Sequence, residues 1–475
     1  MRTLVWFRGK DLRVSDHPPL IDAVRDGEAI PLFVLDPFFF APERARELPA
    51  RMQFLLESLA ELSRSIEALG SRLLLAEGRS IDVIPRLARE WRVDRVAAHR
   101  WVEPFARERD RRVAAALTVP FDLYEGETLR PPGTLRTGAG HPFSVFTPFA
   151  RAFLASAEIP EPIAAPRSLP AVPADVALAG RPLPTLASFG IAPNPNLVRG
   201  GETAAHERLR QFVSGGAARY ASERDRMDHA GTSRLSQDLK FGTISARTVW
   251  HAVGAATNAP HDVRVFRNEL IWREFAHSTL WDRPELSHTP FRAEFENFPW
   301  TFSADRWRAW SDGATGYPVV DAASRQLLGE GFVHNRARMI AASFLTKHLM
   351  IHYREGEAHY MQYLVDGDWA QNNFGWQWSA GCGCDAQAYF RVFNPMLQGK
   401  KFDPDGAYVR RWVPELARVP ARWIHSPWEA PGAVLHEAGV RLGVDYPRPI
   451  VDHAAARAHF LATARQHMAR WRGGE

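Results

Sequence analysis

Short apolar stretches alternate with amphipathic helical patterns over the first 125 residues. The helical patterns cover residues 51–70 and 80–91, where apolar side chains recur every three or four positions. The apolar stretches are 3–8, 29–36, 71–78, 94–100 and 119–126. Strands that alternate with helices indicate parallel βαβ units. We therefore expect a doubly wound α/β domain with five parallel strands.

A proline-rich segment follows this domain. Nine prolines lie between Pro160 and Pro195, a density that is typical of an extended connector on the surface. We therefore expect three parts: an α/β domain at 1–130, an interdomain linker at 131–199 and a helical domain at 200–475.

Helical periodicity dominates the rest of the chain. The patterns cover 201–215, 244–256, 262–280, 317–331, 335–356 and 358–367, and a basic amphipathic helix covers 452–472. The second half is therefore predicted to be almost entirely α-helical.

Composition is that of an ordinary soluble protein. Of the 475 residues, 45% are hydrophobic and 24% are charged, no apolar run reaches the roughly 18 residues of a spanning helix, and the N-terminus does not resemble a signal peptide. These features predict a cytoplasmic protein without membrane association.

The net charge is +5, and basic residues gather at 391–411. That segment is either a solvated charged face or a contact surface for a polyanion such as nucleic acid.

The only two cysteines, Cys382 and Cys384, are one residue apart. A disulfide between them would be strained, and two thiols cannot complete a four-ligand zinc site. We expect both to be small packing residues, and we expect no metal site.

No strand is followed by a glycine-rich dinucleotide fingerprint or a P-loop.

Several other stretches carry side chains suited to ligand binding. Residues 231–245 place Arg234 and Lys240 among Gly, Thr and Ser before a helix, which indicates either a capping turn or an anion cradle. Glu269 and Trp272 share one helical face. Asn335, Arg338 and Met339 are polar or soft side chains at helical spacing, and we expect them to line a cavity.

Eight motifs together resemble the photolyase/cryptochrome family, in order and spacing, from residue 3 to about 415. The motifs are WFRGKDLRVSDHPPL, VFTPF, GTSRLS, NELIWREF, GYPVVDAASRQL, HNRARMIAASFL, DGDWAQNNFGWQWSAG and YFRVFNP. The chain is most similar to class I cyclobutane pyrimidine dimer photolyases. The resemblance implies an α/β domain, a linker and a helical domain that binds flavin adenine dinucleotide (FAD), in a protein that we expect to be a monomer.

The resemblance assigns the cofactor residues, with reduced anionic FAD as the active form. The positions expected to hold the diphosphate are Tyr220, Thr232, Ser233, Arg234, Leu235 and Ser236. Those expected around the isoalloxazine and ribose are Asn335, Arg338, Asp366, Asp368 and Asn372. The amide of Asn372 would face the flavin N5 edge.

The implied reaction is light-driven electron transfer to a flipped-out pyrimidine dimer in DNA. Glu269 and Asn335 would contact the dimer bases, Trp272 and Trp378 would supply flat walls, and Met339 would fill the remaining side. The expected phosphate contacts are Arg224, Arg336, Arg391, Lys400 and Lys401. Asn335 and Met339 match cyclobutane-dimer enzymes and not the branch that repairs (6-4) photoproducts, and we expect the neighbouring His334 to be structural.

Two positions depart from the family pattern. In the chain that re-reduces the flavin, Trp376 and Trp300 match the first and last positions, but the middle position is Tyr353. Trp369, Trp307 and Trp310 are alternative stepping stones.

The second departure concerns the antenna. The folate-binding pattern is absent, whereas Arg51, Glu103, Arg109 and Lys240 match positions that bind a deazaflavin. Asp36, at the end of the second predicted strand, sits where such a ligand would lie. Trp101 replaces a carboxylate there, so a second chromophore stays an open alternative.

Two other functions remain open from the sequence. A cryptochrome-type photoreceptor would bind flavin without repairing DNA, but it would not need the Glu269, Asn335 and Met339 pocket, and the chain ends soon after the helical domain. A flavin oxidoreductase working in the dark would need a nicotinamide site, and the sequence has no fingerprint for one.

Overall fold

The computed structural model describes residues 1–177, 181–255, 259–386 and 388–473. The chain forms two compact units, each assembled from separate stretches of sequence. Unit 1 contains Met1–Ala218, Ser233–Pro284 and Val365–Ala370, and unit 2 contains Arg219–Thr232, Glu285–Leu364 and Gln371–Glu475. The predicted domain boundaries follow chain order, whereas the compact units do not, because residues 233–284 pack with the N-terminal part.

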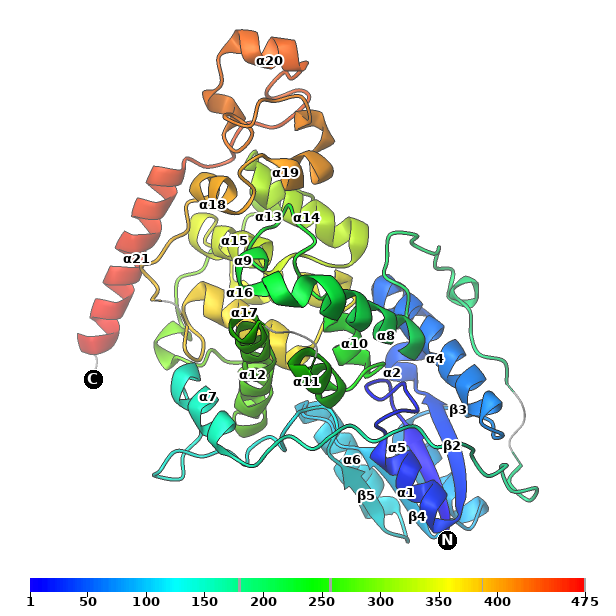
Figure 1. Cartoon of the computed structure of the whole chain (residues 1–475). Helices are drawn as coiled ribbons and strands as arrows, with labels where there is room; N and C mark the ends of the chain where they lie inside the picture. The colour runs from blue at the N-terminus through cyan, green and yellow to red at the C-terminus, as the bar shows by residue number, and fades with distance from the viewer. Residues whose placement is uncertain (178–180, 256–258, 387, 474–475) are drawn as a thin grey trace. The chain divides into compact units, whose positions relative to one another are not determined.

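Unit 1 is built on a parallel sheet of five strands in the order β3-β2-β1-β4-β5 (Figure 1). The strands are β1 (Arg2–Phe7), β2 (Glu28–Leu35), β3 (Leu74–Glu77), β4 (Arg95–His99) and β5 (Phe121–Tyr124). β1 is central and pairs with β2 through Leu4 and Ile30, and with β4 through Thr3 and Arg95. This confirms the predicted doubly wound α/β fold.

Side-chain alternation along β1 explains the layers on the two faces of the sheet. Val5 and Phe7 pack with α1 (Pro18–Asp26) and α4 (Pro49–Ala68). Leu4 and Trp6 pack on the opposite face, against a layer that contains α5 (Ser80–Glu90) and α6 (Pro104–Ala116). Two short helices, α2 (Pro37–Phe40) and α3 (Pro42–Glu47), follow β2.

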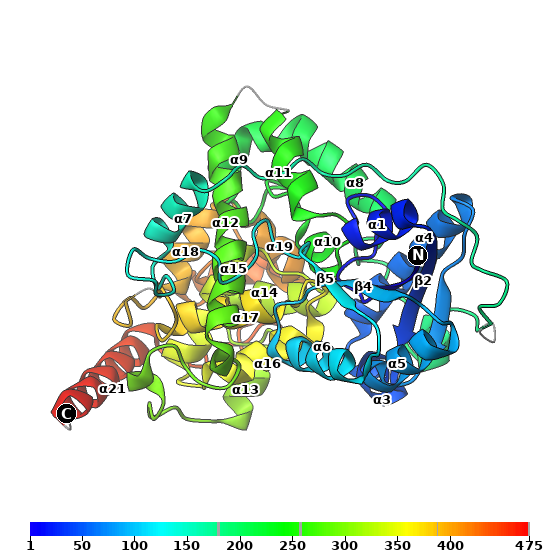
Figure 2. The same ribbon diagram turned by 90° about the horizontal axis from the view of Figure 1, so that it is seen from below.

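The longest of the remaining described helices of unit 1 is α12 (Pro260–Asp282). It contacts α7 (Phe146–Ala155) and α11 (Ala246–Ala255) (Figure 2). α8 (Glu202–Gln211) and α10 (Ser236–Phe241) complete the set. α7 lies inside the predicted 131–199 linker; beyond it, the described linker residues hold one short 3₁₀ turn, Leu186–Phe189.

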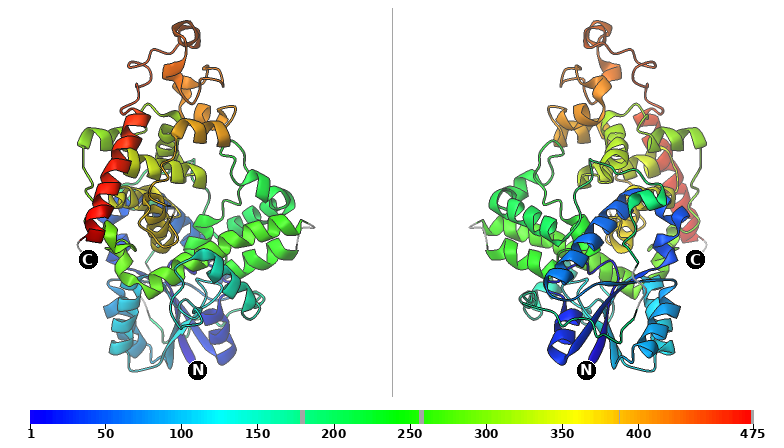
Figure 3. Two further views of the ribbon diagram at one scale, coloured as in Figure 1. Left: turned by 90° about the vertical axis from the view of Figure 1, so that its left-hand side faces the viewer. Right: turned by 90° about the vertical axis from the view of Figure 1, so that its right-hand side faces the viewer.

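Unit 2 is helical and has its own apolar core. Its helices are α9 (Tyr220–Glu223), α13 (Ala304–Ser311), α14 (Pro318–Glu330), α15 (Asn335–Ser343), α16 (Tyr353–Tyr363), α17 (Trp369–Ala380, whose first two residues count with unit 1), α18 (Pro395–Phe402), α19 (Ala407–Trp412), α20 (Gly432–Ala438) and α21 (His453–Gly473). The basic helix α21 packs against the turn 344–348 (Figure 3).

The helical pattern over 335–356 is interrupted in the structure. α15 ends in a π-helical turn at Phe344–His348, and Met350 then adopts a left-handed conformation with φ +58°. His352 caps the next helix by accepting a hydrogen bond from the Arg354 amide at 3.1 Å. The apolar periodicity continues across this break because both helices bury a face in the same core.

Candidate functional site

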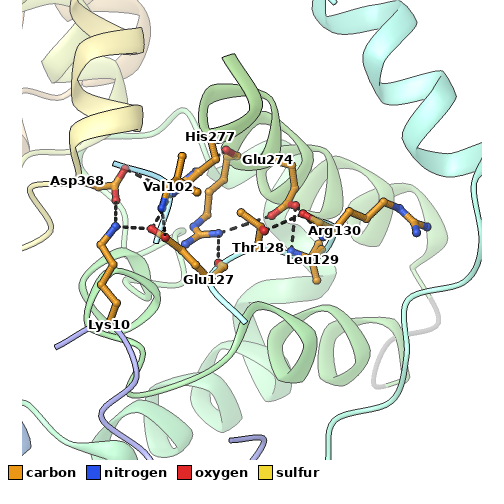
Figure 4. A network of polar contacts seen from close by, with 10 residues as sticks. Lys10, Val102, Glu127, Thr128, Leu129, Arg130, Glu274, His277 and Asp368 are labelled. Atoms are coloured by element: carbon orange, nitrogen blue, oxygen red, sulfur yellow. Dashed lines mark hydrogen bonds and ion pairs between the residues drawn. The ribbon is translucent and has the colours of Figure 1, made fainter. Parts of the chain in front are cut away.

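A cluster of buried charges lies at the carboxyl ends of the strands in unit 1 (Figure 4). Lys10 Nζ forms ion pairs with Glu103 and Glu127 and lies 3.2 Å from Asp368 Oδ2. The four side chains are at most 5% exposed. Lys10, Glu103 and Glu127 follow β1, β4 and β5 respectively, and the carboxyl end of a parallel sheet is where ligand sites form in such folds.

Helix α12 adds His277 to this cluster. His277 Nδ1 donates to the Arg273 carbonyl at 2.8 Å, so Nε2 faces Glu127 Oε1 at 3.3 Å and Asp368 Oδ1 at 3.7 Å. Arg273 Nη1 also donates to the Glu127 carbonyl at 2.7 Å. α12 is therefore fastened to the loop after β5 through both side chains and backbone.

The charges in the cluster hold each other ionised against the cost of burial. Burial would lower the pKa of Lys10, but Glu103, Glu127 and Asp368 together raise it above its usual value. Burial would likewise lower the pKa of His277, but Asp368 and Glu127 raise it to about 9. Lys10 and His277 in turn lower the pKa of Glu127 to about 2, although burial opposes this. At neutral pH His277 is therefore a cation.

Two predicted site residues, assigned to different chromophores, thus meet at one ammonium group. Asp368 was expected beside the flavin and Glu103 beside an antenna, and both contact Lys10. Lys10 and His277 were not among the predicted site residues. Lys10 stands in a quoted motif but carries no local signal for a partner 358 positions away.

The other predicted antenna residues are mostly buried cations. Arg51 and Lys240 are 7% and 9% exposed, and burial with nearby Arg51 and Lys10 lowers the pKa of Lys240 to about 7. Arg109 pairs with Asp110 at 2.9 Å and lies 4.8 Å from the Trp101 ring centre. The Asp36 carboxylate has other partners: it caps α2 and accepts hydrogen bonds from the Ser80 amide and hydroxyl.

The two predicted lesion residues of unit 1 lie one turn apart on α12. The indole of Trp272 stacks on Phe146 of α7, with ring centres 3.6 Å apart and planes within 4°. One face of Trp272 is therefore covered by Phe146. Phe146 belongs to the quoted VFTPF motif, but no role was predicted for it.

The first turn of α15 in unit 2 brings together the residues that were expected to share a face. Asn335 Nδ2 and Arg336 Nη1 each lie 3.7 Å from Met339 Sδ. Asn335 is exposed and Met339 half-buried, so both are accessible. Arg338 Nε donates to the Val333 carbonyl at 2.7 Å, which fixes its guanidinium at the start of the helix.

The predicted electron-transfer residues of unit 2 fall into two aromatic groups. The ring centres of Trp376 and Trp310 are 6.1 Å apart, and those of Trp310 and the half-buried Trp307 are 5.4 Å apart. The predicted partners, Tyr353 and Trp300, each contact His352, at 4.7 and 5.5 Å. Among the described ring contacts, none joins Tyr353 to Trp376.

The remaining predicted cofactor residues lie at turns and helix starts in both units. In unit 1, Ser233, Arg234, Leu235 and Ser236 form the entry to α10, with Arg234 in the left-handed region at φ +52°. Asp366 is buried. In unit 2, Tyr220 is buried at the start of α9 and Thr232 is half-buried. Asn372 Nδ2 donates to the Glu357 carbonyl at 3.0 Å.

The predicted phosphate contacts differ in accessibility. Arg391, Lys400 and Lys401 are exposed, the last two on α18. Arg336 is held by Asp225 in a two-bond ion pair of 2.8 and 2.9 Å. Arg224 lies 5.6 Å from the Tyr220 ring centre and 3.6 Å from Asp225. The exposed lysines are therefore the more available anion contacts.

Cys382 and Cys384 are both buried, and no disulfide joins them. The Cys382 thiol lies 3.7 Å from the Gln377 carbonyl. Burial raises the pKa of this thiol, so it stays protonated and unreactive. Trp378, near the end of α17 and before both cysteines, is half-buried.

In the described part of the chain, two groups of side chains bring potential metal-binding atoms together. Glu127, His277 and Asp368 form one, and there the Lys10 ammonium supplies the cation. Asp11, His17 and His99 form the other. His17 Nδ1 accepts from the Leu20 amide at 3.1 Å, so the proton of its neutral ring is on Nε2, facing Asp11. That atom is a hydrogen-bond donor, and we assign no metal there.

Comparison with known proteins shows to which family this chain belongs. Residues 3–169 match the DNA photolyase model and residues 266–466 match the FAD binding domain of DNA photolyase. A deoxyribodipyrimidine photo-lyase of Agrobacterium fabrum is 41% identical over 97% of this chain and 96% of its own length. The chain belongs to the photolyase/cryptochrome family.

Solved structures from this family agree with the fold. A class III photolyase from Agrobacterium tumefaciens superposes with a TM-score of 0.89 and 39% identity, covering 98% of both chains. A cryptochrome from Synechocystis gives 0.88 and 32% identity, covering 97% of this chain and 99% of its own. The class within the family, expected to be class I, stays a prediction. The FAD-binding character of the C-terminal part is confirmed at the level of the domain.

The structure shows no described helix that is long and apolar enough to cross a membrane.

Proposed function

We propose that this chain repairs cyclobutane pyrimidine dimers in DNA in the light, with reduced anionic FAD supplying, when bound, the electron that splits the dimer. The observation that carries this proposal is the match to photo-lyases over nearly the full length of both chains. The accessible Asn335–Met339 pair supports it, because a dimer pocket needs such side chains.

The protein itself has to bind, orient and shield. Glu269 hydrogen-bonds the base edges of the flipped dimer and Asn335 contacts a carbonyl, while Trp272, Trp378 and Met339 provide apolar walls. Arg391, Lys400 and Lys401 bind phosphates without reading sequence. Arg224 and Arg336 contribute once Asp225 releases them.

The cofactor is held by polar groups drawn from several turns. The residues assigned to it are Tyr220, Thr232, Ser233, Arg234, Leu235, Ser236, Asn335, Arg338, Asp366, Asp368 and Asn372. The chemistry of this set fits a flavin dinucleotide: hydroxyls and a guanidinium for the diphosphate, and carboxylates and amides for the ring and ribose.

Electrons that restore the reduced flavin travel through indoles. Trp376 is the first donor, and the contacts from Trp376 to Trp310 and Trp307 favour this branch over Tyr353 and Trp300. Trp307 is half-buried, so an external reductant can reach the end of the branch.

A deazaflavin-type antenna is the finer part of the proposal. Arg109 lies 4.8 Å from the Trp101 ring centre, and Arg51 and Lys240 are buried and interact electrostatically with each other. This buried positive charge suits an acidic chromophore that binds as an anion. The absorption spectrum of extracted chromophores tests this, since a band beyond those of FAD is required.

One assay tests the repair proposal. Reduced protein receives DNA that contains thymine dimers, and restored thymine is measured under blue light and in darkness. Loss of dimers in light alone is expected, and Glu269→Gln, which keeps the shape of the side chain, should lower the yield per photon. We further infer a cytoplasmic monomer, and light scattering of the purified protein tests the oligomeric state.

The cryptochrome alternative rests on the similarity to the Synechocystis cryptochrome. A photoreceptor would bind flavin and respond to light, yet it would leave the dimers intact. No dimer loss under either condition, from protein that carries reduced flavin, would favour this alternative.

A further inference from the structure

The segment Val365–Ala370 is held in unit 1 by the carboxylate of Asp368. Its Oδ2 faces Lys10 Nζ at 3.2 Å and its Oδ1 faces His277 Nε2 at 3.7 Å. The side chain is 1% exposed. Both oxygens therefore point to buried cations, one from the loop after β1 and one from α12 (Figure 4).

We propose that Lys10 is a positioning residue for the flavin: by fixing Asp368 it sets the place of Asp366, two positions earlier in the same segment. This rests on the proposed function, which assigns both aspartates to the cofactor. Lys10 itself acts through Asp368 and does not need to touch the flavin.

Charge balance shows why Lys10 matters more than an ordinary surface lysine. Three carboxylates, Glu103, Glu127 and Asp368, face two cations, Lys10 and His277. Without Lys10 the three carboxylates would lose the one cation that all of them face, leaving His277 and the electrostatic contributions of Arg273 and Lys240, and an undercompensated buried charge is strongly destabilising. The cluster would relieve this by protonation or by moving Asp368.

The same cluster reaches the lesion side of the proposed site. His277 lies on α12 two turns after Glu269, and Arg273 on the same helix donates to the Glu127 carbonyl. A change at Lys10 is thus transmitted to the flavin segment first, through Asp368, and to the lesion helix second, through Glu127 and His277.

The test uses the full-length protein as purified, with its flavin. Lys10→Met removes the charge and keeps an unbranched apolar side chain of similar length. K10M/E103Q also removes one carboxylate and so returns the formal charge of the cluster to its original value. Glu103 is the right partner because its described side-chain contact is Lys10, whereas Glu127 also accepts from the Val102 amide.

The readouts are flavin retained per protein, flavin midpoint potential and thermal unfolding midpoint. K10M is expected to weaken flavin binding by at least about tenfold, equivalent to ~1.4 kcal/mol, and to shift the potential. K10M/E103Q should recover most of both. Lys347→Met is the matched control: this buried lysine donates to the Arg391 carbonyl, not to a carboxylate, and its loss should leave flavin retention unchanged.

Three outcomes would overturn the proposal. The first is a folded K10M variant that matches wild type in flavin retention and midpoint potential. The second is a K10M/E103Q variant as impaired as K10M, which would mean that Lys10 acts by packing alone. The third is a K347M variant that loses flavin equally. If K10M does not fold, the K10M/E103Q variant tests the proposal. Its flavin retention must then approach that of wild type, and a lower retention overturns the proposal. Wild-type protein that binds no flavin or repairs no dimers would instead refute the proposed function. This failure is distinguishable from failure of the Lys10 proposal, because it is seen in the wild type and not in a variant.

Discussion

At the scale of single residues, Tyr353 is the clearest departure from the family pattern. It is buried, and burial together with Cys382 and Glu357 raises the pKa of its phenol. An oxidised tyrosine has to release that proton to a neighbour. Glu357, one turn along α16, has a pKa raised to about 7 by burial. Electron transfer through Tyr353 is therefore tied to a proton, whereas transfer between indoles is not.

Photoreduction should depend on Trp310 and hardly on Tyr353. Trp310→Phe is expected to slow it at least roughly tenfold, the equivalent of ~1.4 kcal/mol in a barrier, while Tyr353→Phe leaves the rate near wild type. The measurement is the decay of oxidised-flavin absorbance under blue light with a fixed reductant.

Trp428→Phe serves as the control for this pair, because Trp428 packs on Tyr317 outside the indole branch. Unfolding midpoints show whether the lost Trp310 Nε1 bond to the Ala341 carbonyl (3.1 Å) has destabilised the variant. A slow Tyr353→Phe variant beside a normal Trp310→Phe variant would place the electrons on the other branch.

At the scale of elements, α12 carries the residues proposed to contact the lesion, Glu269 and Trp272, on one turn and the buried charges on the next. α7 supports its lesion end through the Phe146–Trp272 stack. Because the two helices come from distant parts of unit 1, the orientation of Trp272 depends on a contact that is not local in sequence.

Phe146→Ala should weaken the binding of dimer-containing DNA. The stack is worth about 0.5–1.5 kcal/mol beyond burial, so we expect a roughly 2- to 10-fold rise in the dissociation constant for damaged duplex and no change for undamaged duplex. Phe143→Ala is the matched control, since Phe143 packs edge-on against Phe149. Equal effects of both substitutions would show that Trp272 does not need the stack.

The exposed end of α18 should contribute affinity without specificity. K400Q/K401Q is expected to weaken binding to damaged and intact DNA alike, and to reduce the slope of log affinity against log salt by up to about 1.8 if both lysines meet phosphates. Arg441→Gln removes an exposed charge on another segment, one paired with Asp445, and should leave the slope unchanged. A loss confined to damaged DNA would contradict the phosphate role.

At the scale of the whole molecule, the buried charges make stability depend on pH. The pKa of His277 is about 9 in the folded chain against 6.5 for the free group. Its stabilising contribution is therefore complete below pH 6.5 and disappears as pH rises through 9. The upper bound is about 3 kcal/mol.

His277→Gln isolates this contribution. The gap in thermal unfolding midpoint between wild type and variant should be large at pH 6 and should narrow by pH 9.5. His436→Gln, at an exposed position on α20, should show no such pH-dependent gap. A gap that stays constant with pH would mean that His277 acts by packing and not by charge.

Local sequence pattern was sufficient to predict the architecture but not the partners of buried polar groups. The five strands were predicted to within a few residues, because alternating apolar runs and helices are local signals. The α15–α16 break was missed because both helices keep the same apolar period. The Asn335–Met339 contact followed from helical spacing, whereas the Phe146–Trp272 stack and the Asp225–Arg336 pair join segments more than 100 residues apart.

The pairing of Lys10 with Asp368 also constrains how the chain can fold during its synthesis. All five strands are complete by residue 124, so the sheet can form early. The carboxylate of Asp368 emerges 358 residues after Lys10, roughly 20 to 70 s later at ordinary translation rates. Until then Lys10 has only Glu103 and Glu127 as partners, and the strand ends stay hydrated. The N-terminal part therefore reaches its final, dry charge balance only after more than three quarters of the protein has been made.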